Sequence, residues 1–186
     1  MCVFDSLEAT LLDSTGVLIE ITLDLIRECR RLTERINALE GQLRRVVRQL
    51  APALLAVPGC GVLGAAAILG ETAGAARFKS KHAFAHCNGT APIPVWSSNK
   101  VRVRLNRGGN RTINNALHMI AVTQVRGDGK GAAYYAKQIA AGKTVKEALR
   151  LLKRRISDRV FRALLADESA QRVQAQPATE VIKLAA

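Results

Sequence analysis

Two adjacent serines, Ser97 and Ser98, lie in an arginine-rich segment and could carry phosphoryl chemistry. A serine hydroxyl can attack phosphorus while guanidinium groups neutralise the phosphoryl oxygens. The arginines that follow the two serines are Arg102, Arg104, Arg107 and Arg111. The plainer alternative is a polar turn whose neighbouring arginines only bind backbone phosphates. Residue types by themselves favour this plainer interpretation.

The positive charge of the chain is concentrated around these serines. The 186 residues include 28 Lys and Arg against 15 Asp and Glu, which gives a net charge of +13. Residues 72–146 hold thirteen of the basic residues and one acid, Asp128, and so have a net charge of +12. Residues 1–71 have a net charge of −2 and residues 147–186 of +3. A polyanionic partner, in most such proteins nucleic acid, is therefore expected on the middle third.

Other chemistries have less support in the sequence. The four cysteines lie far apart, at positions 2, 29, 60 and 87, which predicts reduced thiols in the cytosol rather than disulfides or a zinc site. His82, His86 and Cys87 have the spacing of one helical turn, but no second cluster completes a tetrahedral set, so no metal site is predicted. Only Asp128 and Glu147 are acidic between residues 72 and 150, too few for two-metal catalysis there.

A β-hairpin is expected to position the serines. Val95-Trp96 and the run 101–105, in which apolar and basic residues alternate, lie on either side of Ser97-Ser98-Asn99-Lys100. Helices are expected around this hairpin, since Ser80 and Asn110 are good N-cap residues and Thr144 with Glu147 forms a capping box. The last helix is expected to end near Leu165, and residues 168–186 lack clear periodicity.

A heptad repeat extends over residues 17–57. One hydrophobic series consists of Leu18, Leu25, Leu32, Leu39 and Val46, and a second of Thr22, Cys29, Ile36, Leu43 and Leu50. Charged residues lie between them. This pattern predicts a long coiled-coil helix and, through it, a homo-oligomer or an antiparallel partner helix. The alternative is a long amphipathic helix that packs on its own domain.

The uncharged stretch 49–70 contains two prolines and four glycines, so no membrane span is predicted. Its centre, Val57-Pro58-Gly59-Cys60-Gly61, fits a helix-hairpin-helix element, in which Gly59 and Gly61 let backbone N–H groups approach a phosphate. A plain turn between two helices fits equally well.

The predicted nucleic-acid-binding residues are Gly59, Gly61, Arg77, Lys79, Lys100, Arg102, Arg104, Arg107 and Arg111.

The expected fold is therefore mainly α. It has three parts: an N-terminal segment with the coiled-coil helix at residues 1–54, a helical domain with the helix-hairpin-helix element and the hairpin at 55–167, and a loose tail at 168–186.

The ordered motifs resemble the C-terminal domain of insertion-sequence transposases of the IS110 type and their IS116 relatives. The motifs are Val57-Pro58-Gly59-Cys60-Gly61, Arg77-Phe78 with Ser80, Asn88-Gly89-Thr90-Ala91-Pro92, Ser97-Ser98, Arg107-Gly108-Gly109-Asn110-Arg111, Tyr134-Tyr135 with Lys137, and 142–149. The resemblance covers roughly residues 55–167, and the heptad helix is similar to the coiled coil that precedes this domain in the family.

The resemblance implies DNA recombination guided by a structured RNA of the element. It places the serine that becomes joined to DNA on Ser98, with Ser97 in reserve, although Asn99 stands where the family has glycine. It also implies an N-terminal RuvC-like domain whose four acids hold Mg²⁺. Asp5, Glu8 and Asp13 are too close together to be these acids, so we expect a fragment that needs no cofactor of its own and by itself binds but does not cleave nucleic acid.

Two functions are therefore expected from the sequence. The first is DNA transposition in the bacterial cytosol and nucleoid, with Ser98 as nucleophile when a RuvC-like domain is supplied. The alternative is a non-catalytic, nucleic-acid-binding coiled-coil oligomer. A scaffold that binds anionic lipid fits less well, because the basic residues flank turns and a strand rather than one amphipathic helix.

Overall fold

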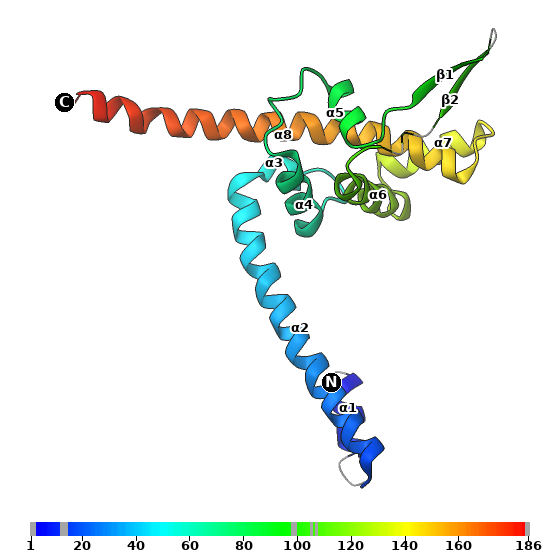
Figure 1. Cartoon of the computed structure of the whole chain (residues 1–186), viewed down its shortest axis with the longest axis vertical. Coiled ribbons are helices and arrows are strands. Elements are labelled where there is room, and N and C mark those ends of the chain that lie inside the picture. Colours follow the sequence, from blue (N-terminus) through cyan, green and yellow to red (C-terminus); the bar gives the residue numbers. More distant parts are fainter. Residues whose placement is uncertain (1–2, 12–14, 98–99, 105, 107, 185–186) are drawn as a thin grey trace. The chain divides into compact units, whose positions relative to one another are not determined.

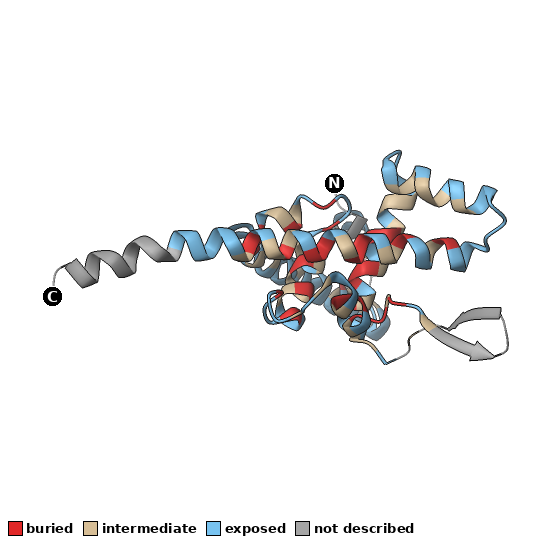
Figure 2. Cartoon of the chain, turned by 90° about the horizontal axis from the view of Figure 1, so that it is seen from above, coloured by how far each residue is buried: buried red, intermediate tan, exposed pale blue. Residues whose placement is uncertain are grey.

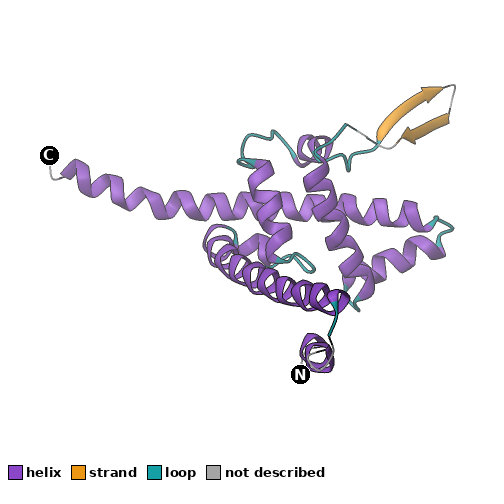
Figure 3. Cartoon of the chain, turned by 60° about the horizontal axis from the view of Figure 1, so that its bottom comes forward, coloured by secondary structure: helices purple, strands orange, loops and turns teal. Residues whose placement is uncertain are grey.

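The computed structural model describes the backbone of residues 3–11, 15–97, 100–104, 106 and 108–184, and the side chains of these residues outside 3–4, 94–104 and 175–184. The fold is mainly α, as expected, with one pair of strands in the described part (Figure 3). The chain divides into two compact units, Met1–Leu43 and Arg44–Ala186. The sequence placed this division later, after residue 54.

The first unit contains helix α1 (Val3–Leu11) and most of helix α2 (Val17–Leu50). Arg30 of α2 forms ion pairs with Asp5, at 2.9 Å, and with Glu8 on α1. Ile26, one turn before Arg30, is buried. The heptad positions Leu25 and Leu32 remain exposed, so α1 does not cover the hydrophobic seam of α2.

The second unit is built around one long helix, α8. Helix α8 contacts α3, α5, α6 and α7, while α4 packs against α6 and α3 (Figure 1). The bounds of these elements are α3 (Pro52–Leu55), α4 (Val62–Thr72), α5 (Lys81–Cys87), β1 (Ile93–Ser97), β2 (Lys100–Arg104), α6 (Arg111–Arg126), α7 (Lys130–Ala140) and α8 (Val145–Leu184).

The core of this unit forms where α8 meets the shorter helices. Its buried positions recur every four residues along the helix, which places them on one side, as the red segments of α8 show in Figure 2. Phe161 of α8 stacks on Phe84 of α5 with ring centroids 5.4 Å apart, and Phe78 meets Phe84 edge-on at 5.3 Å. Complete burial of a side chain such as Phe84 contributes about 1.5–3 kcal/mol.

Three helix starts agree with the sequence. The hydroxyl of Ser80 accepts from Ala83 N at 3.2 Å, and Asn110 Oδ1 accepts from Ile113 N at 2.9 Å. Thr144 and Glu147 form the expected capping box, since Glu147 Oε2 accepts from Thr144 N and Thr144 Oγ1 accepts from Glu147 N. Each signal uses atoms within four residues, which is why the sequence alone reveals it.

The end of α8 differs from the sequence prediction. The helix does not end near Leu165 but continues to Leu184, through the segment expected to be a loose tail. Three residues within about one turn and a half make tertiary contacts. Asp167 accepts from Ala53 N (2.8 Å) and from Leu54 N (3.0 Å), Glu168 accepts from two N–H groups, and Gln171 donates to a carbonyl. Because these contacts are made by polar side chains, they do not produce the hydrophobic periodicity from which a helix is predicted.

The uncharged stretch 49–70 does not form one helix. It contains the end of α2, all of α3 and the start of α4, separated by turns at Ala51 and at 56–61. Among the described helices, none combines the length and the apolar character needed to cross a bilayer. This agrees with the sequence, in which prolines and glycines interrupt the stretch.

Candidate nucleic-acid interface

The hairpin expected from the sequence is present in the backbone. Strands β1 and β2 pair antiparallel, with Ile93 opposite Arg104, Val95 opposite Arg102 and Ser97 opposite Lys100. The predicted nucleophile Ser98 and the predicted phosphate ligand Arg107 lie outside the described residues. The side chains of Ser97, Lys100, Arg102 and Arg104 lie outside them as well, so their roles remain predictions.

The segment before the hairpin, residues 86–89, and the segment after it, residues 106–110, meet at the base of the hairpin. Gly89 has a positive φ of 72°, and a Cβ on Gly109 would overlap the backbone of Gly89. Asn110 N donates to Cys87 O at 2.6 Å, and Asn106 Nδ2 donates to His86 O at 3.1 Å. The Asn-Gly-Thr and Arg-Gly-Gly-Asn motifs therefore form a closed base from which the hairpin extends.

A buried asparagine connects this base to α6 and α8. Asn88 is fully buried, and its Nδ2 donates to Ser157 Oγ on α8 at 2.8 Å. Its Oδ1 accepts from Thr90 N and Thr90 Oγ1, at 3.1 and 2.7 Å. Its carbonyl oxygen accepts from Asn114 Nδ2 on α6, at 2.7 Å. Because each of these polar groups has a partner, the network holds the base of the hairpin in one position.

A cavity of about 580 Å³ opens beside this base. We call it the hairpin-base cavity. It lies between residues 89–92, Asn106, helix α6 and the first turns of α8. Its charged lining is almost entirely positive: Arg111, Lys143, Lys146, Arg150, Lys153 and Arg154, with Glu147 as the acid. The positive charge of this lining is suited to phosphate oxygens.

Lys153 lies at the centre of this positive charge. Its Nζ donates to Asn114 Oδ1 at 2.7 Å, and the side chain is partly buried. Burial lowers the pKa of Lys153, and the nearby charges of Arg111 and Arg150 lower it further. The cost of keeping this ammonium protonated would fall if an anion entered the cavity.

The nearby carboxylates offset only part of the positive charge of the cavity. Hydrogen bonds from Thr144 lower the pKa of Glu147, as do the charges of Lys143 and Arg150, and its carboxylate caps α8. Arg154 forms an ion pair with Asp158 on its own helix. Within the part of the chain that the structure describes, no ion pair is formed by four cations of the lining: Arg111, Lys143, Lys146 and Arg150.

Comparison with known proteins shows which family part of the chain resembles. Residues 51–136 match the transposase family IS116/IS110/IS902. These residues are therefore similar to a transposase domain of that family. The insertion element IS110 uncharacterized 43.6 kDa protein of Streptomyces coelicolor is 32% identical over 171 residues, which cover 89% of this chain. The chain spans 42% of the length of that relative.

The matched residues and the segment that follows them, with α8, both line the hairpin-base cavity. Arg111 and the hairpin base lie within the matched residues, whereas the cations of α8 follow them. The sequence predicted Arg111 but missed five cations: Lys143, Lys146, Arg150, Lys153 and Arg154. A usable signal was present, because Lys146, within the capping box, and Arg150 and Lys153 after it have helical spacing and therefore lie on one side of α8.

Four other residues predicted to bind nucleic acid lie elsewhere. Gly61 is the N-cap of α4, and Gly59, with a positive φ of 80°, lines a second cavity. Arg77 and Lys79 are exposed before α5, where the Arg77 guanidinium lies 4.6 Å from the centroid of the Phe78 ring. The helix-hairpin-helix element remains a prediction, since the helix before the turn, α3, has only four residues.

Magnesium, which the family resemblance implies for another domain, has no fitting site in the described residues. No three Asp, Glu, His or Cys side chains lie together there. His82, one of the residues with metal-ligand spacing, instead has its Nδ1 3.1 Å from Nη2 of Arg154.

Proposed function

We propose that this chain acts in DNA transposition and binds the DNA backbone in the hairpin-base cavity, beside the hairpin that carries the nucleophile Ser98. The observation that supports this is a cluster of six cations in a cavity at the base of that hairpin, four of which form no ion pair with any described residue. The family comparison gives transposition as the process. Together they favour DNA as the polyanion that the charge distribution implies.

The electrostatics favour a bound phosphate over an empty cavity. Arg111 and Arg150 lie close enough to lower the pKa of Lys153, so the protonated cluster repels itself. A phosphodiester would accept hydrogen bonds from these groups, and their positive charge would release the counterions condensed on the DNA. The hairpin base is fixed to α6 and α8 through Asn88, so a strand held in the cavity would have a fixed position relative to the base of the hairpin.

The chemical step proposed for Ser98 is a phosphoryl transfer. The Ser98 oxygen forms a bond to phosphorus and loses its proton, while one bond between phosphorus and a sugar oxygen breaks and that oxygen leaves as a hydroxyl. The number of phosphoester bonds is unchanged, so no oxidant or reductant is needed. In this proposal a RuvC-like domain supplies Mg²⁺, a structured RNA of the element guides the choice of DNA, and the reaction takes place in the bacterial cytosol.

DNA binding by charge variants tests the use of the cavity. We expect the double variant Arg111→Gln with Arg150→Gln to bind labelled duplex DNA at least about tenfold more weakly than the unaltered chain. The slope of log affinity against log salt should fall by about 2, because two phosphate contacts are lost. The charge-matched control Lys137→Gln with Arg172→Gln removes exposed cations outside the cavity and should change affinity less than about threefold. Equal affinities of both variants, with unchanged thermal unfolding, would contradict the proposal.

A second function is favoured by the exposed seam of α2. Leu18, Leu25 and Ile36 have more than 60% of their surface exposed in the single chain, although they occupy heptad core positions. A second copy of the same helix offers the complementary hydrophobic series. The alternative proposal is therefore a homo-oligomer that binds nucleic acid without catalysing transfer.

A further inference from the structure

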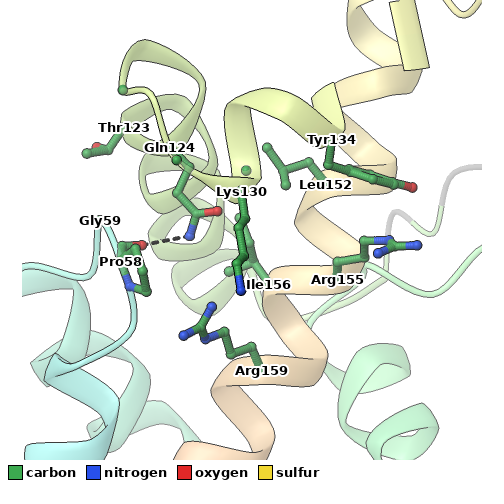
Figure 4. Close-up of a pocket in the computed structure, with 13 residues that line it drawn as sticks. Pro58, Gly59, Thr123, Gln124, Lys130, Tyr134, Leu152, Arg155, Ile156 and Arg159 are labelled. Carbon is green, nitrogen blue, oxygen red and sulfur yellow. Dashed lines mark hydrogen bonds between the residues drawn. The ribbon is translucent and has the colours of Figure 1, made fainter. Parts of the chain in front are cut away.

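A second cavity, of about 530 Å³, lies on another side of α8. It is lined by the turn at Pro58-Gly59, the end of α6, the start of α7 and the middle of α8 (Figure 4). We call it the α7 cavity. It shares no lining residue with the hairpin-base cavity.

Two close backbone approaches build the α7 cavity. A Cβ on Gly59 would lie 3.1 Å from Ile120 O, and Gly59 also has a positive φ. A Cβ on Gly131 would lie 2.8 Å from Cβ of Gln124, tighter than real contacts allow. Gln124 in turn donates from Nε2 to Pro58 O at 2.7 Å, the dashed line in Figure 4. The turn at Pro58-Gly59, the end of α6 and the start of α7 are therefore fixed to one another without a charged group.

The charged side chains of the α7 cavity are all cationic. They are Lys130 of α7 and Arg155 and Arg159 of α8. Arg155 lies 4.0 Å from the centroid of the Tyr134 ring, a cation–π contact that orients its guanidinium. Lys130 and Arg159 point into the same space, toward each other (Figure 4). Within the described residues neither Lys130 nor Arg159 forms an ion pair, and no acid lines the cavity.

Two like charges that converge in a walled cavity indicate a ligand of opposite charge. The first turn of α7 adds to this, because its N-cap, Gly129, provides no side-chain acceptor for the first N–H groups of the helix. A tetrahedral phosphate group could accept hydrogen bonds from the ammonium of Lys130 and the guanidinium of Arg159 together.

We infer that the α7 cavity binds a backbone phosphate of DNA, as a second anchor beside the one in the hairpin-base cavity. This inference rests on the proposed function for the choice of DNA as the ligand. Helix α8 connects the two anchors, since it contributes Arg150, Lys153 and Arg154 to one cavity and Arg155 and Arg159 to the other. The DNA contact of the chain then extends to both sides of α8.

The test compares DNA affinities of three double variants of the full chain over a range of salt concentrations. We expect Lys130→Gln with Arg159→Gln to weaken binding of a labelled duplex about tenfold and to reduce the salt slope by about 1–2. The control, Lys137→Gln with Arg172→Gln, removes the same charges from the same two helices outside both cavities and should have less than about a threefold effect. Thermal unfolding of each variant shows whether the fold is retained.

A measurement on the unaltered chain supports the test if a variant fails to fold. Bound DNA should protect the Lys130 amine from acetylation more than it protects Lys137, which lies two turns further along α7. Equal protection, or a variant at Lys130 and Arg159 that matches its control, would overturn the inference.

The two proposals can fail separately. If the variant at Arg111 and Arg150 loses affinity but the variant at Lys130 and Arg159 does not, the inference falls and the proposed function stands. If only Lys130 and Arg159 matter, the DNA site lies in the α7 cavity and the proposed use of the hairpin-base cavity is wrong. If the unaltered chain does not bind DNA, both fall.

Discussion

Lys153 of the hairpin-base cavity combines partial burial with like charge nearby, which is unfavourable in the free chain. Burial and two neighbouring guanidinium groups lower its pKa, and its hydrogen bond to Asn114 offsets only part of that cost. The one carboxylate in the described lining, that of Glu147, caps α8 and forms no ion pair with Lys153. The residues instead leave room for an anion from outside, which is the arrangement that phosphate-binding sites require.

The role of Ser98 is the residue-level prediction. When the chain is combined with a RuvC-like domain of a family member, DNA and Mg²⁺, a covalent protein–DNA adduct should form and be visible on a denaturing gel. We expect Ser98→Ala to abolish the adduct because no other atom supplies the bond to phosphorus, while DNA affinity changes less than about threefold. Ser97→Ala is the matched control and should retain the adduct.

Two outcomes would contradict this assignment. An adduct that persists in Ser98→Ala and disappears in Ser97→Ala would move the nucleophile to Ser97. An adduct that no serine substitution affects, or complete absence of an adduct from the unaltered chain under these conditions, would favour the non-catalytic alternative.

At the scale of elements, the base of the hairpin depends on two glycine-containing turns that touch. We expect Gly109→Ala to destabilise the second unit by about 2–4 kcal/mol, because the new Cβ would overlap the backbone of Gly89. Gly108→Ala is a matched control, since its Cβ would meet only Asn106 Oδ1 at an ordinary 3.6 Å. Urea unfolding measures both. Equal stability of the two variants would show that the turns can separate without cost.

The elements also show which features a sequence can reveal. The caps at Ser80, Asn110 and Thr144 were predicted because each uses atoms within four residues. The hairpin was predicted from its alternation and its turn residues. The continuation of α8 was missed because it depends on contacts such as that of Asp167 with Leu54, which are 113 residues apart.

The candidate site was predictable only in part, for the same reason. Arg111 was identified from its own motif, but its cavity exists only where α6 meets α8, and Lys153 reaches Asn114 across 39 residues of sequence. Similarly, Gly59 was assigned to a phosphate-binding turn from its pattern, whereas the cations beside it come from α7 and α8. Local signals locate residues, and packing decides which of them meet.

At the scale of the whole molecule, the exposed seam of α2 predicts self-association. A hydrophobic series exposed over several turns is unfavourable in water, and a second copy buries it. We expect the unaltered chain to sediment as a dimer or larger assembly at micromolar concentration. The double variant Leu32→Gln with Leu39→Gln should be monomeric and as helical as before, because both side chains are exposed in the single chain.

Cysteine reactivity gives this prediction a second readout and an internal reference. Cys29 is exposed in the single chain but occupies a seam position, so association should slow its alkylation, and the seam variant should restore the fast rate. Cys60 should react slowly in both proteins, because burial raises its pKa to about 11. The control Val17→Gln with Leu63→Gln removes two exposed hydrophobic side chains that are not seam positions and should leave the assembly intact. A monomeric unaltered chain, or one alkylation rate for Cys29 in every protein, would show that α2 does not pair with a second copy.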